Sequence, residues 1–202
     1  MEEITQKMCF TIGHSNHSID NFLKLLKKWK IEYLLDVRSK PYSKYAEQFN
    51  KEKLVEQLRN NGFQYRYLGN KIGGSSIRFH DSSQDVPKLK QYRNKKEFKD
   101  GIKILYTFIL KKKKIAIMCS EKDPFNCHRF FLIAYCLQKK DVKVNHILFN
   151  GEIIENRTLE KKLKDNISQK TLTGYNEKEK NLDDLYEDHY LKIFKKFSEQ
   201  EK

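Results

Sequence analysis

Apolar residues are arranged along this chain in two alternating patterns. Continuous apolar runs of strand length lie at 10–12, 33–37, 115–118 and 142–148, and a run with alternating polar positions lies at 63–68. Apolar residues at helical spacing lie between these runs, over 19–29, 54–58, 95–112 and 130–137. Because strand and helix alternate, we predict an α/β fold, in which a three-layer arrangement holds a mostly parallel sheet between flanking helices.

Local signals at the ends of these segments support this reading. Ser18 and Asn50 are predicted N-caps of the first two helices, and Gly62 is predicted to end the second helix in the C′ position. Residues 69–93, which include several Gly and Ser, are predicted to form one long loop. A loop of that length inside a domain is usually functional or mobile.

The chain divides near residue 150. Residues 1–150 are predicted to form the α/β domain that carries the functional site, and residues 151–202 a helical C-terminal extension. An amphipathic helix is expected from Leu182 to Phe197, where it either covers the domain or binds a protein partner.

Positive charge is concentrated in the first part of the chain. The net charge is +14, and residues 1–150 hold 30 Lys and Arg against 15 Asp and Glu, whereas residues 151–202 hold 11 against 12. Such a field attracts phosphate groups, above all those of nucleic acid. The alternative is a general bias of the composition toward Lys, with Lys111–Lys114 forming only a solvated helix end.

Two classes of protein are disfavoured by the composition. No apolar run approaches the ~20 residues that cross a bilayer, so no membrane association is expected. The segment Met1-Glu2-Glu3 begins acidic and lacks an apolar core, which argues against a signal peptide. We therefore expect a cytoplasmic protein, in which Cys9, Cys119, Cys127 and Cys136 are not a disulfide framework.

The segment 119–129 is the richest in reactive side chains. It reads Cys-Ser-Glu-Lys-Asp-Pro-Phe-Asn-Cys-His-Arg and leads from a predicted strand into a predicted helix, with Pro124 at N1 and Asn126 as N-cap. The free N–H groups of such a helix start bind anions and lower a thiol pKa. Three interpretations stay open here: an anion-binding site, with or without a nucleophilic thiol; a metal site of Cys119, Cys127 and His128; or plain structural packing.

The residue spacing in this segment differs from that of two kinds of thiol enzyme. A tyrosine-phosphatase-like loop needs Arg six residues after its Cys, but Phe125 stands there and the Arg is at 129. A rhodanese-like sulfur carrier has a tight loop, whereas this loop is longer and contains Pro124. Sulfur transfer is therefore a minor alternative.

Two further polar clusters follow predicted strands. Asp36 and Arg38 lie two positions apart, so on an extended chain both point to one side, either toward a ligand or toward each other as a buried ion pair. Gly13-His14-Ser15 follows the first strand, and His14 there is either a general base or a structural histidine. Ligands of parallel sheets bind at the carboxyl ends of the strands, where all three clusters are expected.

Together these motifs resemble the domain of unknown function numbered 488. The resemblance rests on Thr11 to Ser15, Asp36-Val37-Arg38-Ser39 with Pro41 and Ser43, Phe49-Asn50, Tyr67-Leu68-Gly69, and Cys119-x-Glu121 to Cys127-His128-Arg129, over residues 9–150. It implies an intracellular α/β protein linked to nucleic-acid or nucleotide processing, without a defined reaction. The family pattern leads us to expect an Arg soon after Gly73-Gly74, but Ser75-Ser76 follows, and Arg78 is the candidate substitute.

The leading hypothesis is an enzyme that acts on a nucleotide or nucleic acid. The residues predicted to react are Cys127, Cys119, His14 and His128. The residues predicted to bind substrate, with the arginines on phosphate, are Ser15, Asp36, Arg38, Glu121 and Arg129. No cofactor and no metal ligand are assigned.

Two other classes of function compete with this hypothesis. The first is a non-catalytic, basic nucleic-acid-binding module that uses the aromatic residues Tyr42, Tyr45, Tyr65 and Tyr67. The second is a partner-binding protein that works through its C-terminal helix.

Overall fold

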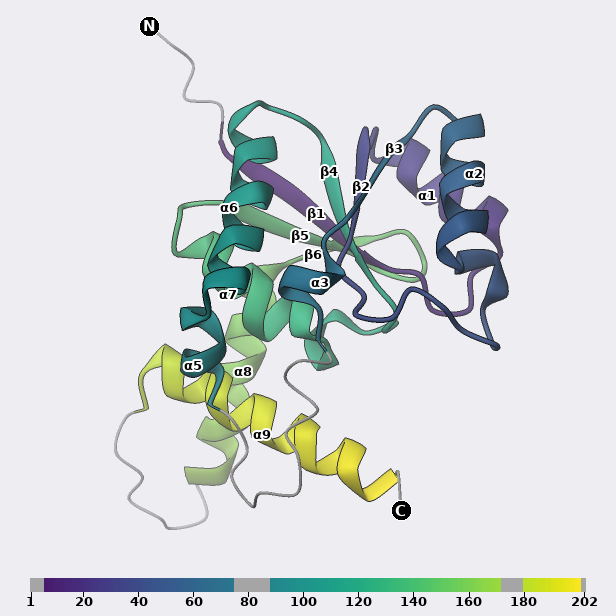
Figure 1. Ribbon diagram of the computed structural model, residues 1–202. Helices are drawn as coiled ribbons and strands as arrows, with labels where there is room; N and C mark the ends of the chain where they lie inside the picture. The colour runs from purple at the N-terminus through teal and green to yellow at the C-terminus, as the bar shows by residue number, and fades with distance from the viewer. Residues whose placement is uncertain (1–5, 75–87, 172–179, 201–202) are drawn as a thin grey trace, which may run out of the picture.

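One six-stranded sheet forms the centre of the protein, which a computed structural model describes over residues 6–74, 88–171 and 180–200 (Figure 1). The strands are β1 (Met8–Gly13), β2 (Tyr33–Asp36), β3 (Gln64–Tyr67), β4 (Ile115–Cys119), β5 (Lys143–Ile147) and β6 (Ile153–Glu155). Their order across the sheet is β3-β2-β4-β1-β5-β6, and every neighbouring pair is parallel except β5 and β6. The predicted α/β fold is confirmed.

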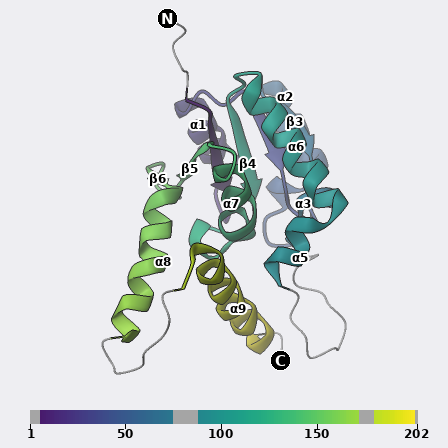
Figure 2. The ribbon, with the colours of Figure 1, turned by 90° about the vertical axis from the view of Figure 1, so that its left-hand side faces the viewer.

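Helices cover both faces of this sheet. The α-helices are α1 (Ile19–Lys28), α2 (Lys51–Asn60), α3 (Gly69–Ile72), α5 (Leu89–Asn94), α6 (Lys96–Leu110), α7 (Tyr135–Gln138), α8 (Asn156–Thr171) and α9 (Leu182–Gln200). Two 3-10 helices, η1 (Glu47–Phe49) and η2 (Pro124–Asn126), and the π-helix η3 (Arg129–Ala134) complete the elements. Figures 1 and 2 show α1 and α2 on one side of the sheet and α6 and α7 on the other.

Each face has its own apolar core. One core joins the inner sides of α1 and α2 to Phe10, Ile12 and Leu34 of the strands. The other joins α6, η3, α7 and α9 to Leu35 and Ile117. Side chains of successive strand residues point to opposite faces, which explains why Leu34 and Leu35 belong to different cores.

The predicted ends of α1 and α2 are found, with one difference. Ser18 caps α1 by accepting a hydrogen bond from the N–H of Asn21 at 3.3 Å, and Gly62 follows α2 with a φ of +79°. Asn50 occupies the N-cap position of α2, but its side chain does not cap the helix. The Asn50 Oδ1 instead accepts from the N–H of Ser43, in the loop after β2, at 2.7 Å.

The structure corrects three element predictions. The predicted loop over 69–93 contains α3 and α5, with residues 75–87 outside the description. The fourth helix begins as the π-helix η3, and the predicted N1 and N-cap positions belong to a separate turn, η2, whose N-cap is Asp123. The strand β6 lies in the segment predicted to be wholly helical, where its three half-buried residues are too few to show a periodic pattern.

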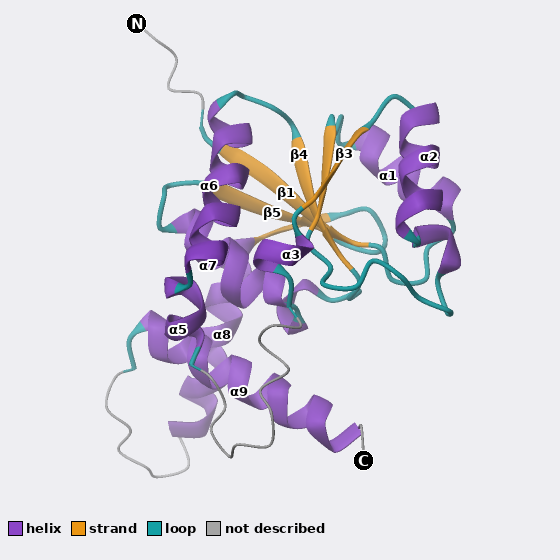
Figure 3. Cartoon of the chain, in the orientation of Figure 1, coloured by secondary structure: helices purple, strands orange, loops and turns teal. Residues whose placement is uncertain are grey.

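The C-terminal helix α9 packs on the rest of the protein (Figure 3). Tyr186 and Tyr190 are buried against the core, the carboxylate of Glu187 accepts from the N–H of Leu89, and His189 Nε2 donates to the carbonyl of Phe125 at 2.7 Å. Of the two roles expected for this helix, the structure shows the covering one, and a protein partner there stays a prediction. Among the described residues no helix is both long and apolar enough to span a membrane.

Candidate functional site

The three predicted polar clusters meet at the carboxyl edge of β2, β4 and β1, which are neighbours in the sheet. Backbone hydrogen bonds continue the pairing past the strands, from His14 N–H to the Cys119 carbonyl and from Ser15 N–H to the Ser120 carbonyl, both at 2.9 Å. The helix after β1 and the helix after β4 lie on opposite faces, which is the arrangement that opens a crevice in parallel sheets.

Asp36 and Arg38 form a buried ion pair at the end of β2. Arg38 Nη2 donates to Asp36 Oδ2 at 2.7 Å, and Arg38 Nε donates to Oδ1 at 3.0 Å. The hydroxyl of Tyr65 on β3 donates to the same carboxylate at 2.8 Å. The side chain of Asp36 is fully buried and that of Arg38 is 4% exposed. The structure therefore contains the buried ion pair that was one of the two interpretations of this cluster. The sequence did not reveal Tyr65 as its third member.

His14 orients the free side of this guanidinium. Its Nε2 lies 3.2 Å from Arg38 Nη1, which is always a donor, so Nε2 accepts and Nδ1 carries the proton that is donated to the Ser15 carbonyl at 2.9 Å. Burial and the charge of Arg38 lower the pKa of His14 to about 4. Both ring nitrogens are thus engaged in the described structure, and a general-base role for His14 stays a prediction.

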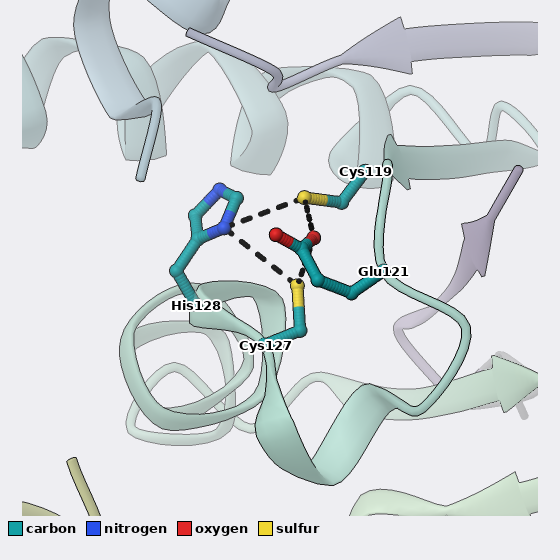
Figure 4. Close-up of side chains that lie close together, drawn as sticks. All are labelled: Cys119, Glu121, Cys127 and His128. Atoms are coloured by element: carbon teal, nitrogen blue, oxygen red, sulfur yellow. Dashed lines mark hydrogen bonds between the residues drawn. The ribbon is translucent and has the colours of Figure 1, made fainter. Parts of the chain in front are cut away.

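Two thiols, a carboxylate and an imidazole converge in the segment that follows β4 (Figure 4). Cys119 Sγ lies 2.6 Å and Cys127 Sγ 3.1 Å from Glu121 Oε2, and His128 Nδ1 lies 3.4 Å from Cys119 Sγ and 3.6 Å from Cys127 Sγ. We call Cys119, Glu121, Cys127 and His128 the thiol cluster. It is the group within the described residues whose side chains could hold a metal ion, since all four ligand atoms lie within 4.8 Å of one another.

The two thiols of this cluster differ electrostatically. Burial by itself would raise the pKa of Cys119, but the hydrogen bond with Cys127 and the nearby His128 ring outweigh it and lower that pKa to about 6. Burial, together with the adjacent Cys119 sulfur, raises the pKa of Cys127 well above its ordinary value. Of the two cysteines, Cys119 is thus the better thiolate.

Arg129 supports the loop of the thiol cluster from behind. Its side chain is fully buried, and Nη2 donates to the carbonyls of Glu121 and Lys122 at 2.9 and 3.1 Å. A Cβ on Gly13 would lie 1.8 Å from the Glu121 carbonyl oxygen and 2.8 Å from Arg129 Nη1, so only glycine lets β1 approach this loop. One terminal nitrogen of the guanidinium expected on a phosphate is therefore engaged with the backbone of the loop.

The double glycine lies between the ion pair and the thiol cluster. A Cβ on Gly73 would lie 2.4 Å from Ser39 Oγ, and a Cβ on Gly74 would lie 2.8 Å from His128 Nδ1. These glycines thus permit a close approach to Ser39 and to His128, a role that the sequence did not reveal. The predicted substitute Arg78 lies outside the described residues.

The structure brings the nine predicted site residues to one edge of the sheet, eight of them in three groups and Ser15 apart. The thiol cluster holds Cys119, Glu121, Cys127 and His128, the ion pair with its orienting ring holds Asp36, Arg38 and His14, and Arg129 lies behind the loop. Ser15 is half-buried with a φ of 45°, and its hydroxyl donates to Asn16 Oδ1 at 3.4 Å. Which of these residues react or bind substrate stays a prediction.

Fold and site together define an α/β protein with a polar, thiol-containing centre at the carboxyl edge of a parallel sheet. A family model described as "Domain of unknown function DUF488" matches residues 18–136, and the chain belongs to that family. No curated protein and no solved structure matches the chain. The matched range contains both Asp36 with Arg38 and the thiol cluster, and it begins after Gly13 and His14.

Proposed function

We propose that this protein is an enzyme that acts on a nucleotide or on nucleic acid at the carboxyl edge of β2, β4 and β1. In this proposal the guanidinium of Arg38 binds a phosphate of the substrate, and the thiol cluster supplies the reactive groups. Ser15 lies at the same edge and contributes a hydroxyl to the substrate.

The observation that carries the proposal is the convergence of buried ionisable groups from three strand ends. Burying charged and titratable side chains costs free energy, so such groups collect where chemistry needs them more often than where packing does. Here Asp36 and Arg38 come from β2, His14 from β1 and the thiol cluster from the segment after β4, at the edge where parallel sheets bind ligands.

A phosphate-bearing substrate fits the donors that Arg38 still offers. A guanidinium has five N–H donors. In the described structure Nε and Nη2 of Arg38 each donate one hydrogen bond to Asp36, and Nη1 donates one to His14. The remaining donors on the two terminal nitrogens of the planar guanidinium suit two oxygens of a phosphate group. The excess of positive charge over residues 1–150 favours the same class of substrate.

The test is mass spectrometry of the small molecules and nucleic acid that co-purify with the protein, followed by incubation with a pool of nucleotides and short oligonucleotides. We would compare wild type with Arg38→Lys, which keeps the charge but loses the planar fork, and with Ser15→Ala as a milder variant. The matched control replaces Lys111, Lys112 and Lys114 by Gln, because these exposed residues lie at the opposite, amino end of β4.

We expect a nucleotide that stays bound at high salt in wild type and in the lysine control, with its retention reduced at least tenfold by Arg38→Lys, and a product that forms only when Arg38 is present. A basic binding module would behave in the opposite way, since its nucleic acid would dissociate with salt and with the lysine control while Arg38→Lys bound normally. The proposed enzyme activity would be refuted by that second pattern. It would also be refuted if the protein converted none of the nucleotides or oligonucleotides in the pool.

A further inference from the structure

We propose that the thiol cluster is a zinc site, in which Cys119, Cys127 and His128 are permanent ligands and Glu121 is the exchangeable fourth ligand (Figure 4). The site lies where the proposed function places its reactive groups, and the proposal identifies those groups as zinc ligands. Metal binding itself requires no nucleotide, so the two proposals can be tested apart.

The separations between the imidazole nitrogen and the two sulfurs match a tetrahedral zinc site. A zinc ion lies ~2.3 Å from a thiolate sulfur and ~2.0 Å from an imidazole nitrogen, which at tetrahedral angles sets each S···N distance at about 3.5 Å. The distances from His128 Nδ1 to the two sulfurs are 3.4 and 3.6 Å. The single nitrogen that faces both thiols is thus already placed as a ligand.

Glu121 differs from the other three donors. Its Oε2 lies 2.6 and 3.1 Å from the sulfurs of Cys119 and Cys127, whereas a tetrahedral zinc site sets each S···O distance at about 3.5 Å. The carboxylate therefore has to withdraw when zinc enters, and it is the partly exposed donor of the four, whereas Cys119, Cys127 and His128 are buried. Three fixed protein ligands and one exchangeable position are the arrangement of catalytic zinc sites.

The loop that carries these donors is held in place by contacts outside the cluster. Arg129 fixes the carbonyls of residues 121 and 122, and the carboxylate of Asp123 accepts from the N–H of Phe125 at 2.9 Å. Gly74 lies against the ring of His128, where a side chain would meet Nδ1. Supports of this kind orient the ligands of metal sites.

The chemistry of the donors selects zinc among the common divalent cations. Mg²⁺ and Ca²⁺ take oxygen ligands, and this set offers one carboxylate beside two thiols and an imidazole. Thiolate and imidazole together suit Zn²⁺, which binds such mixed sets tetrahedrally.

The test uses the full chain, purified without chelator, and measures bound zinc by elemental analysis and Co²⁺ binding by absorption. We expect one zinc per chain, and a Co²⁺ spectrum with the thiolate charge-transfer and tetrahedral bands. Cys119→Ser and Cys127→Ser should each weaken binding at least ~100-fold, since even the outer supports of metal ligands change affinity by ~10–100-fold. The matched control Cys136→Ser, a partly buried thiol outside the cluster, should bind zinc like wild type.

Glu121→Gln should retain the metal with less than ~10-fold loss, because the three buried donors remain. Added zinc should also raise the melting temperature of metal-free wild type, a readout that does not depend on the folding of any variant. Wild type that binds no zinc and shows no such rise would overturn the site, as would an equal loss of zinc in Cys136→Ser. Zinc binding in a protein that converts no nucleotide would keep this site and refute the proposed function instead.

Discussion

Replacing Asp36 by Asn should destabilise the protein strongly, because it removes one partner of a buried ion pair. The Asp36 carboxylate accepts hydrogen bonds from the Arg38 guanidinium, from the Arg38 N–H at 3.0 Å and from the Tyr65 hydroxyl at 2.8 Å. In Asp36→Asn an amide NH₂ replaces one acceptor oxygen, and Arg38, only 4% exposed, keeps a charge with no counter-ion. Breaking a buried pair in this way costs about 3–5 kcal/mol. For a chain of this size that cost lowers the melting temperature by about 6–20 °C.

The assay is urea unfolding at pH 7, followed by far-ultraviolet circular dichroism and by the fluorescence of Trp29, the single tryptophan of the chain. The matched control is Glu47→Gln, which removes the same charge from an exposed ion pair with Lys53, where both side chains are more than half exposed. That control should cost no more than about 1 kcal/mol. A cost for Asp36→Asn below 1 kcal/mol, similar to the control, would show that the ion pair is not held as the structure describes it.

Two further predictions concern the packing around the sheet. Burial lowers the pKa of His146 to about 3, against ~6.5 in the unfolded chain, so the unfolded state takes up the proton first as pH falls. The stability that neutral His146 contributes is thus complete above pH ~6.5 and falls by about 2 kcal/mol between pH 7 and pH 5, which urea unfolding at the two pH values would measure. His146→Gln should show a smaller pH dependence, and an unchanged one would contradict this. Gly13→Ala places its Cβ 1.8 Å from a backbone oxygen of Glu121 and should lower the stability measured by thermal unfolding. The loss should exceed that of the control Gly62→Ala, whose Cβ meets nothing within 4 Å and which costs ~1 kcal/mol through its positive φ. Equal losses of stability in the two variants would refute the close approach at Gly13.

The local pattern of apolar and polar residues predicted the elements that pack on the sheet. Ser18 and Gly62 bound their helices as expected, and the buried runs at β1, β2, β4 and β5 became parallel strands. Such features depend on neighbours within a few positions of the chain, which a periodic pattern records directly. The same pattern did not reveal β6, α3 or α5, because each of these short segments contains fewer than two full repeats of burial.

The site was predictable as a set of residues but not as a geometry. Strand ends marked Cys119, Asp36 and His14 in the sequence, since polar side chains there follow apolar runs. Only the strand order, with β4 between β2 and β1, puts these three ends side by side, and that order is decided by contacts between segments far apart in the chain. The inward position of Arg129 and the meeting of Glu121 with two thiols were likewise decided by tertiary packing. A sequence states which donors are available, whereas the folded backbone decides which of them face a ligand and which face one another.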